Sequence, residues 1–190
     1  MLQKSGAVAL PVRIPEQLEG IDGLLIPGGE STTIGKLMQI YGLMQPIKSL
    51  VHQDFPLMGT CAGMILLAKE ATDLNFAPLG AIDISVQRNA FGRQVDSFEV
   101  DLPIVALGTQ PFHAVFIRAP FVKDIRTGVE VLACLGDGTI VAAQQRKVLA
   151  VAFHPELTDD IRLHRYFIEK LVGDNTRGRY KNNKEQSERK

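Results

Sequence analysis

A cysteine stands between two glycines in "LMGTCAGMILL", directly after an apolar run and directly before a predicted helix. A chain that passes from strand into helix within one residue needs unusual backbone angles at the central residue. It also needs glycine wherever a β-carbon would collide with the neighbouring element. The spacing Gly59-x-Cys61-x-Gly63 therefore predicts a nucleophile elbow, a corner at which a strand of a sheet leads directly into a helix.

The rest of the chain alternates short apolar runs with amphipathic segments. The predicted strands are residues 7–14, 23–29 and 55–61 and several runs between 81 and 153, where "GDGT" (136–139) is a hairpin turn. The predicted helices are residues 62–71, 159–173 and 31–51, the last as one helix or as a pair broken near Gly42 and Pro46. This order predicts an α/β fold, a three-layer sandwich with a partly mixed sheet.

Length and charge exclude several classes of protein. A chain of 190 residues, 45% of them hydrophobic, fits one globular domain. Because 21 basic residues balance 21 acidic ones, no net charge favours nucleic acid, and no apolar run approaches the roughly 20 residues that span a bilayer. We expect residues 174–190 to be a basic, disordered tail. The two cysteines do not make a disulfide framework, which favours a cytoplasmic location.

Cys61 is the candidate nucleophile. A thiol at the amino terminus of a helix meets partial positive charge, which favours the reactive thiolate. The alternative is a buried structural cysteine, which is what a free cysteine most often is. A neighbouring base would favour the first interpretation.

That base is predicted at the end of the apolar run "AVAF", where His154-Pro155-Glu156 follows. Residues two apart in an extended chain point the same way, and Pro155 favours an extended His154. Histidine can take and return a proton, and a carboxylate on its other ring nitrogen fixes its tautomer. Taken singly, the two residues would be an ordinary histidine and a helix-start glutamate. Together with the elbow, His154 and Glu156 predict a Cys-His-Glu triad. The other histidines, His52, His113 and His164, lack the spacing of metal ligands, so no metal is expected.

The loop "PGGEST" is the third element. Gly28 and Gly29 leave backbone N–H groups able to approach an anionic intermediate, and Glu30 and Ser31 can contact a polar substrate. The loop is equally well a glycine turn before a capped helix. It lacks the Lys-Ser/Thr ending of a P-loop and the G-x-G-x-x-G spacing of a dinucleotide-binding loop.

Five ordered motifs carry a resemblance: "PGGEST", "GTCAG", "RNAFGRQVDSFE", "FIRAP" and "FHPELT". From about Leu18 to Leu171 the chain resembles the glutaminase subunits of pyridoxal 5′-phosphate synthase, a family of triad-type (class I) glutamine amidotransferases. The resemblance implies a flavodoxin-like fold with a mainly parallel sheet, a glutamine amidotransferase domain at 1–173 and no cofactor. It also implies hydrolysis of L-glutamine to glutamate and ammonia, with the ammonia passed to a synthase partner.

The resemblance assigns roles to individual residues. Cys61 would attack the amide, His154 would act as base and then acid, and Glu156 would orient His154. The implied substrate contacts are Gly29, Glu30, Ser31, Arg88, Ile117 and Arg118, and the oxyanion would lie against the backbone N–H groups of Gly29 and Ala62. Arg88 and Arg118 stand in apolar stretches, so each guanidinium needs a carboxylate, either that of glutamine or a structural one.

One departure concerns the start of the chain. Members of this family begin with a strand and loop of the type "GVLALQG", and here "MLQKSG" follows no such segment, so we expect the first strand to be missing. Three alternatives to the implied function stay open. The chain could be a binding subunit that lacks activity without this strand, or the glutaminase subunit of another amidotransferase, such as that of histidine biosynthesis. It could also be a peptidase or a glyoxalase-like enzyme.

Overall fold

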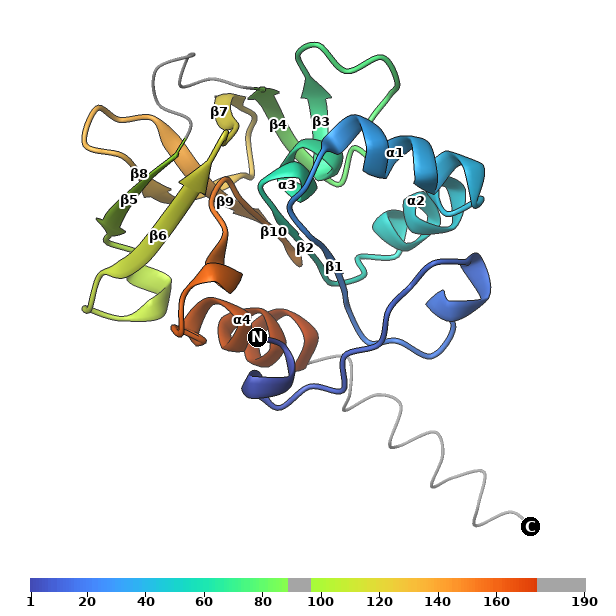
Figure 1. Cartoon of the computed structure of the whole chain (residues 1–190), viewed down its shortest axis with the longest axis horizontal. Coiled ribbons are helices and arrows are strands. Elements are labelled where there is room, and N and C mark those ends of the chain that lie inside the picture. Colours follow the sequence, from blue (N-terminus) through green and yellow to red (C-terminus); the bar gives the residue numbers. More distant parts are fainter. Residues whose placement is uncertain (89–96, 174–190) are drawn as a thin grey trace.

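A computed structural model of the chain describes residues 1–88 and 97–173 (Figure 1). Its helices are α1 (Ser31–Ile40), α2 (Met44–His52), α3 (Ala62–Leu67) and α4 (Arg162–Tyr166), which continues as the π-helical segment η5 (Phe167–Val172). Short 3₁₀ turns are η1 (Gln3–Ser5), η2 (Pro15–Leu18), η3 (Val105–Leu107) and η4 (Pro155–Leu157). The predicted terminal helix at 159–173 is therefore confirmed, with its start at Arg162.

Eight strands form one sheet, in the order β1-β2-β10-β9-β7-β4-β3, with β8 paired to β9. They are β1 (Leu24–Ile26), β2 (Leu57–Thr60), β3 (Ala68–Ala71), β4 (Ile82–Gln87), β7 (Phe121–Ile125), β8 (Glu130–Cys134), β9 (Ile140–Gln145) and β10 (Val148–Val151). The pairs β1–β2, β2–β10 and β3–β4 are parallel, whereas β9 joins β10, β7 and β8 in antiparallel pairs, as β7 joins β4. The predicted α/β fold with a mixed sheet is confirmed.

Helices cover both faces of the parallel strands. Every residue of β2 and β10 is buried, which requires cover on both sides. Ile26 pairs with Gly59, so the two point to one face, where a β-carbon on Gly59 would lie 2.7 Å from Leu67 of α3. Gly23 points to the other face, because it lies an odd number of residues from Ile26, and its β-carbon would lie 3.2 Å from Phe167 of η5. The sheet is therefore the middle of three layers (Figure 1).

A separate hairpin, β5 (Ser97–Leu102) with β6 (Phe112–Ile117), packs beside the end of β10. Phe98 stacks on Phe116 with ring centroids 4.5 Å apart. Phe112 and Phe116 each lie 5.6 Å from the ring of Phe153, and all three of these phenylalanines are fully buried. This aromatic cluster fixes the hairpin against the residue that precedes His154.

Two helix predictions need refinement. Residues 31–51 form a pair of helices, and Gly42 at the break has a φ of 71°, which favours glycine. Pro46 does not break a helix, because it lies in the first turn of α2, where its missing N–H costs no hydrogen bond. The predicted helix 62–71 ends at Leu67, since the backbone of Ala68–Ala71 pairs with β4 as strand β3.

The predicted strand at 7–14 is wrong for this structure. Among residues 1–88 and 97–173, this segment has no strand partner, and Val8 is 89% exposed. A strand forms only where its backbone pairs with another strand. Within the described residues the edge strand β1 pairs with β2 alone, so residues 7–14 do not join the sheet beside it. Most of "RNAFGRQVDSFE" (89–96) and the predicted tail (174–190) lie outside the described residues. In the part of the chain that is described, no helix is long and apolar enough to cross a membrane.

Candidate active site

Cys61 occupies the corner between β2 and α3 that its sequence predicts. Its backbone has a φ of 49° and a ψ of −105°, a conformation that L-residues rarely adopt. A β-carbon on Gly59 would lie 2.5 Å from the backbone of Gly63, and one on Gly63 would lie 2.0 Å from the carbonyl oxygen of Ile26. Both glycines are therefore required by close backbone contacts, and the predicted elbow is confirmed.

Cys61 is 5% exposed and is hydrogen-bonded to two other strands, β10 and β6. Its backbone N–H donates to the carbonyl of Val151 at 2.8 Å, which ties the corner to β10. Its thiol donates to the carbonyl of Ile117 at the end of β6, with Sγ and O 3.8 Å apart. Cys134, the other free cysteine, lies on β8.

His154 follows β10 and lies between Cys61 and Glu156. Its Nδ1 is 2.8 Å from Oε1 of Glu156. The hydrogen bond with Cys61, and then that with Glu156, raise the pKa of His154 to about 10 against the opposing effect of burial. Burial is the largest single effect on Glu156 and raises its pKa, but the hydrogen bond from His154, a backbone N–H and the charge of His154 together outweigh it, so the pKa of Glu156 is lowered. A pKa of about 10 keeps His154 protonated at neutral pH, so the imidazolium is the donor in its hydrogen bond with Cys61, and its charge favours the reactive thiolate.

The contact between His154 and Glu156 arises differently from the sequence prediction. His154 itself is close to extended, but Pro155–Leu157 form the 3₁₀ turn η4, and this turn brings the carboxylate back to the ring. The backbone N–H of His154 donates to the carbonyl of Val115 on β6 at 2.8 Å. Strand β6 therefore contacts both Cys61 and His154 through its main chain, a role that no pattern of side chains indicates.

The glycine loop lies against the imidazole. A β-carbon on Gly28 would lie 2.3 Å from Cε1 of His154, and Gly29 has a φ of 141°. Glu30 caps α1: its carboxylate accepts from the backbone N–H groups of Thr32 at 2.9 Å and Thr33 at 2.7 Å. The hydrogen bonds from Thr33, first of all from its hydroxyl, and from Thr32 lower the pKa of Glu30 to about 2. Next to it, Ser31 is buried.

Arg88 finds a structural carboxylate. Its Nη2 lies 3.3 Å from Oε1 of Glu30 and 3.2 Å from the hydroxyl of Thr32, and its Nη1 donates to the carbonyl of Asp73. The side chain is 15% exposed. Of the two alternatives for this guanidinium, the structure contains the protein carboxylate, and that carboxylate belongs to the predicted substrate loop.

The remaining predicted residues flank the thiol. Ile117 ends β6 with 40% of its surface exposed, and Arg118 follows it in an exposed position with a φ of 44°. Ala62 is buried as the first residue of α3, and the first N–H groups of a helix have no partner within it. The structure thus brings the predicted residues to the carboxyl ends of β1, β2 and β10 or to the segments beside them.

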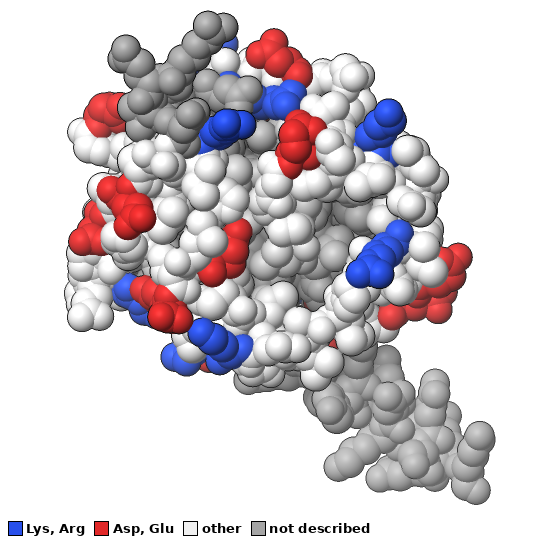
Figure 2. Space-filling view, viewed as in Figure 1, with Lys and Arg blue, Asp and Glu red and all other residues white. Residues whose placement is uncertain are grey.

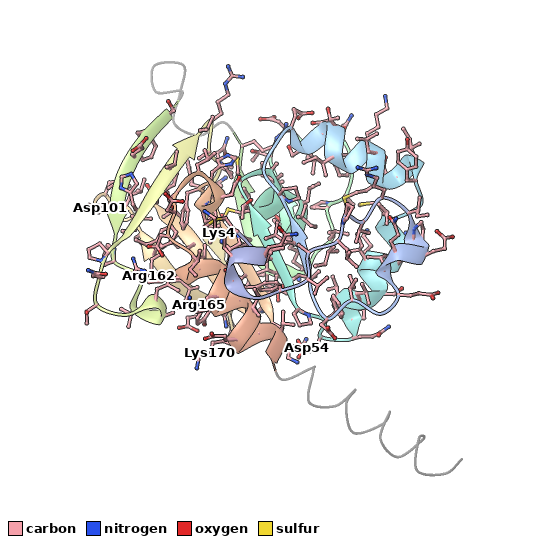
Figure 3. All side chains as sticks on the ribbon, turned by 60° about the horizontal axis from the view of Figure 1, so that its bottom comes forward. Lys4, Asp54, Asp101, Arg162, Arg165 and Lys170 are labelled. Atoms are coloured by element: carbon pink, nitrogen blue, oxygen red, sulfur yellow. The ribbon has the colours of Figure 1, made fainter. Side chains whose placement is uncertain are left out.

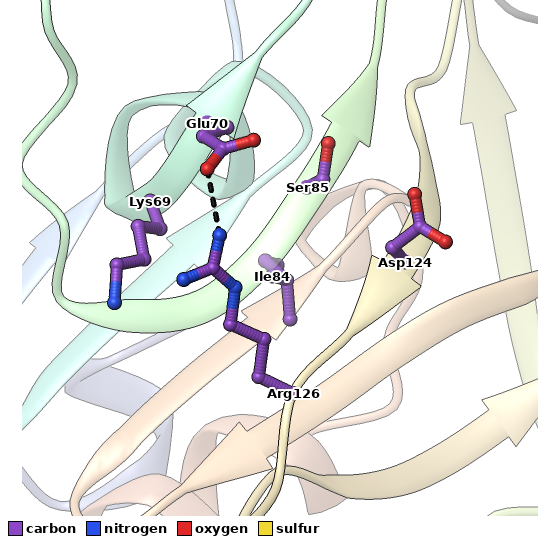
Figure 4. A pocket seen from close by; sticks show the side chains of 6 residues that line it. All are labelled: Lys69, Glu70, Ile84, Ser85, Asp124 and Arg126. Atoms are coloured by element: carbon purple, nitrogen blue, oxygen red, sulfur yellow. Dashed lines mark hydrogen bonds and ion pairs between the residues drawn. The ribbon is translucent and has the colours of Figure 1, made fainter.

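Other features of the described residues do not compete with this site. Within the described ranges no group of His, Cys, Asp and Glu side chains could hold a metal ion. On the face shown in Figure 2, acidic and basic side chains are interspersed. A pocket of about 250 Å³ lies over β3, β4 and β7 (Figure 4), but its basic side chains pair with neighbouring carboxylates, Lys69 with Asp83 and Arg126 with Glu70.

Comparison with known proteins relates the chain to one group. The model of the SNO glutamine amidotransferase family matches residues 1–173. The pyridoxal 5′-phosphate synthase subunit PdxT of Carboxydothermus hydrogenoformans is 56% identical over 170 residues, which are 90% of this chain and 88% of the relative. The subunit of the same name from Pelotomaculum thermopropionicum is 57% identical over 180 residues, 94% of this chain and 91% of the relative.

Solved structures agree with this relation. The crystal structure of a glutamine amidotransferase is 52% identical in sequence and superposes with a TM-score of 0.84 over 90% of each chain. A putative GMP synthase protein from Thermoplasma acidophilum, 16% identical, superposes with a TM-score of 0.57 over 88% of this chain and 80% of the other. The second likeness extends to the fold alone.

Proposed function

This chain belongs to the SNO glutamine amidotransferase family, and from that premise we propose that Cys61, His154 and Glu156 are the triad with which it hydrolyses L-glutamine. The chain is the glutaminase subunit of a pyridoxal 5′-phosphate synthase, as its named relatives are subunits of that synthase. The observation that carries the triad is the hydrogen-bonded row of thiol, imidazole and carboxylate at a strained corner. We assign the glutaminase domain to residues 1–173.

The proposed reaction begins at sulfur. With His154 protonated on the ring nitrogen that does not face Glu156, the thiolate sulfur of Cys61 attacks the side-chain amide carbon of glutamine and a carbon–sulfur bond forms. His154 then gives this proton to the departing nitrogen, the carbon–nitrogen bond breaks, and ammonia leaves a thioester on Cys61. Water attacks the thioester with His154 as base, which releases glutamate and regenerates the thiol.

The tetrahedral intermediates carry a negative charge on the former carbonyl oxygen. We assign its stabilisation to the backbone N–H groups of Gly29 and Ala62, which come from the glycine loop and from the start of α3. We assign glutamine binding to Glu30, Ser31, Arg88, Ile117 and Arg118. The carboxylate of Glu30, ionised at neutral pH, suits the ammonium group of a free amino acid. Arg88 holds this carboxylate in place through its ion pair.

The ammonia is then delivered to a partner. We propose that the chain works with the lyase subunit of pyridoxal 5′-phosphate synthase in the cytoplasm, where its two free cysteines stay reduced. Free ammonia released without an acceptor would be wasted, so we expect the isolated chain to be nearly idle and the partner to activate it.

The test is glutamate release from glutamine with and without the synthase subunit. The parent protein and Cys134→Ala are expected to respond equally to the partner, because Cys134 lies on β8 away from the elbow. Cys61→Ala is expected to release no glutamate above background. Full activity of Cys61→Ala would refute the triad, and a rate that does not change at saturating partner would refute the coupling.

A further inference from the structure

Strand β6 carries the main-chain contacts to both reacting groups. The carbonyl of Val115 accepts from the backbone N–H of His154, and the carbonyl of Ile117 accepts from the thiol of Cys61. Yet β6 belongs to the two-stranded hairpin and not to the eight-stranded sheet from which Cys61 and His154 project. The spacing of Cys61 and His154 comes from the pairing of β2 with β10, whereas the hairpin carbonyls orient the thiol and the main chain of His154, so this orientation depends on how firmly the hairpin is held.

One side chain holds the start of β6. Arg162, the first residue of α4, donates from Nη1 to the carbonyl of Gln110 and from Nη2 to the carbonyl of Pro111, each at 2.8 Å. Its guanidinium lies over the ring of Phe112, 5.9 Å from the centroid. In Figure 3 Arg162 lies at the lower end of the hairpin, beside α4. These contacts fix the two residues that precede β6.

The same guanidinium is bound from its other side by Asp160. Nε of Arg162 lies 3.1 Å and 3.0 Å from the two carboxylate oxygens, and Nη2 lies 2.6 Å from Oδ2. Asp160 belongs to the turn that follows Glu156, and its backbone N–H donates to the hydroxyl of Thr158. With side chains only 27% and 22% exposed, Arg162 and Asp160 link the start of β6 to the segment that carries His154 and Glu156. The planar fork of the guanidinium lets one arginine bind both sides at once.

We propose that Arg162 is a positioning residue for the glutaminase reaction: it fixes β6 to the segment 154–160 and so maintains the orientation of the Cys61 thiol relative to the His154 imidazole. The inference rests on the proposed triad. It goes beyond it in assigning a role in the reaction to a side chain that touches neither glutamine nor the triad. A clamp that only stabilised the fold would change the melting temperature and leave the chemistry of the folded protein unchanged.

The test compares Arg162→Gln with Arg162→Lys and with a matched control, Arg126→Gln. Arg126 is also an arginine in an ion pair, with Glu70, but it follows β7, which is separated from β10 by β9 in the sheet. All variants are made in a Cys134→Ser background so that alkylation by iodoacetamide reports on Cys61 alone. The readouts are the pH at which alkylation reaches half its maximal rate, the kcat and KM for glutamine with saturating synthase subunit, and a thermal melt.

For Arg162→Gln we expect kcat to fall about tenfold or more, because small misplacements of reacting groups cost about 10- to 100-fold. KM is measured separately, because Ile117 and Arg118, which we assign to glutamine binding, lie at the end of β6. We also expect the alkylation midpoint to rise by about one pH unit, since a loosened His154 takes the thiol proton less readily. Arg162→Lys keeps the charge beside Asp160 but reaches at most one carbonyl. Its alkylation midpoint should therefore lie between those of the parent and of Arg162→Gln. Arg126→Gln should match the parent.

A folded Arg162→Gln whose alkylation midpoint and kcat equal those of Arg126→Gln would overturn the proposal. If Arg162→Gln does not fold, Arg162→Lys decides by the same criterion. Failure of the triad itself is recognised separately, because glutamate release would then persist in Cys61→Ala. The alkylation profile does not depend on turnover, so it tests the role of Arg162 by itself.

Discussion

Gly28 and His154 are in such close contact that a β-carbon on the glycine would lie 2.3 Å from Cε1 of the imidazole. Any side chain at this position would meet the ring, so Gly28→Ala must displace it. We predict that this substitution lowers kcat about 100-fold, since a shift of about 1 Å in a reacting group has an effect of that size. Glutamate release in the presence of the synthase subunit measures it.

The matched control for Gly28→Ala is Gly136→Ala. Gly136 lies in the β8–β9 hairpin turn, where an added β-carbon would have no atom within 4 Å and where φ is not positive. It should keep the parental rate and melting temperature. A Gly28→Ala protein with parental kcat would show that the imidazole does not need its present position.

The elbow predicts selective labelling. A diazo-ketone analogue of glutamine should alkylate Cys61 and leave Cys134 unmodified, because only the first lies beside a base and at the start of a helix. Peptide mass spectrometry identifies the labelled cysteine. His154→Asn should abolish both labelling and turnover, whereas Glu156→Gln should lower turnover and still bind glutamine. Label on Cys134 would contradict the assignment.

His154 makes stability depend on pH in the alkaline range. Its pKa is raised to about 10 from about 6.5 in the unfolded chain, so its stabilising effect is complete below pH 6.5 and is lost as the pH rises towards 10. We predict that the melting temperature of the parent falls relative to that of His154→Asn between pH 7 and pH 10. Parallel curves for the two proteins would contradict this prediction.

His164 makes stability depend on pH in the opposite direction. Burial, and then the positive amino terminus, lower its pKa to about 4 against the attraction of Glu156, and its Nδ1 has no hydrogen-bond partner among the described residues. The unfolded chain therefore takes up the proton more readily, and stability is lost as the pH falls from about 6.5 towards 4. His164→Leu should reduce the decline of the melting temperature between pH 6.5 and pH 5. An unchanged decline would show that other groups cause it.

Glu30 combines a cap with an ion pair, and two variants separate them. Glu30→Ala removes the acceptor of Thr32 and Thr33 and should lower the free energy of unfolding by about 1 kcal/mol, the usual cost of a lost helix cap. Glu30→Gln keeps one of the two oxygens of the cap and loses the charge that faces Arg88, so it should raise KM for glutamine and lower stability less than Glu30→Ala does. Denaturant unfolding and steady-state kinetics measure the two effects.

Local chemistry made the elbow predictable from sequence. Gly59 packs against Gly63 within one strand–helix corner, and the corner determines where Cys61 points, although Gly63 is also required by its contact with Ile26 of β1. The row of His154 and Glu156 was also predictable, although the contact comes from a 3₁₀ turn that proline starts and not from an extended chain. The contacts that made these features predictable, Gly59 with Gly63 and His154 with Glu156, join residues within a few positions of one another.

Contacts across long separations were not predictable. Whether residues 7–14 form a strand depends on a pairing partner, which composition does not reveal, and the helix from Ala62 stops early because β4 pairs with Ala68–Ala71. The partner of Arg88 could be narrowed to a carboxylate, but choosing Glu30 requires the fold that brings residues 58 positions apart together. Arg162 reaches two carbonyls that lie 52 and 51 positions away, and no side-chain pattern marks such acceptors.

Val115 and Ile117 reach the reacting groups through carbonyl oxygens alone, and every amino acid carries the same carbonyl. Mutational drift at these two positions is therefore limited by the need to remain a strand and not by the chemistry of the triad. Replacing the side chain of Ile117, which is 40% exposed, leaves the oxygen beside the thiol unchanged. Selection on the reaction and selection on the surface that surrounds it thus act on different atoms of the same residue.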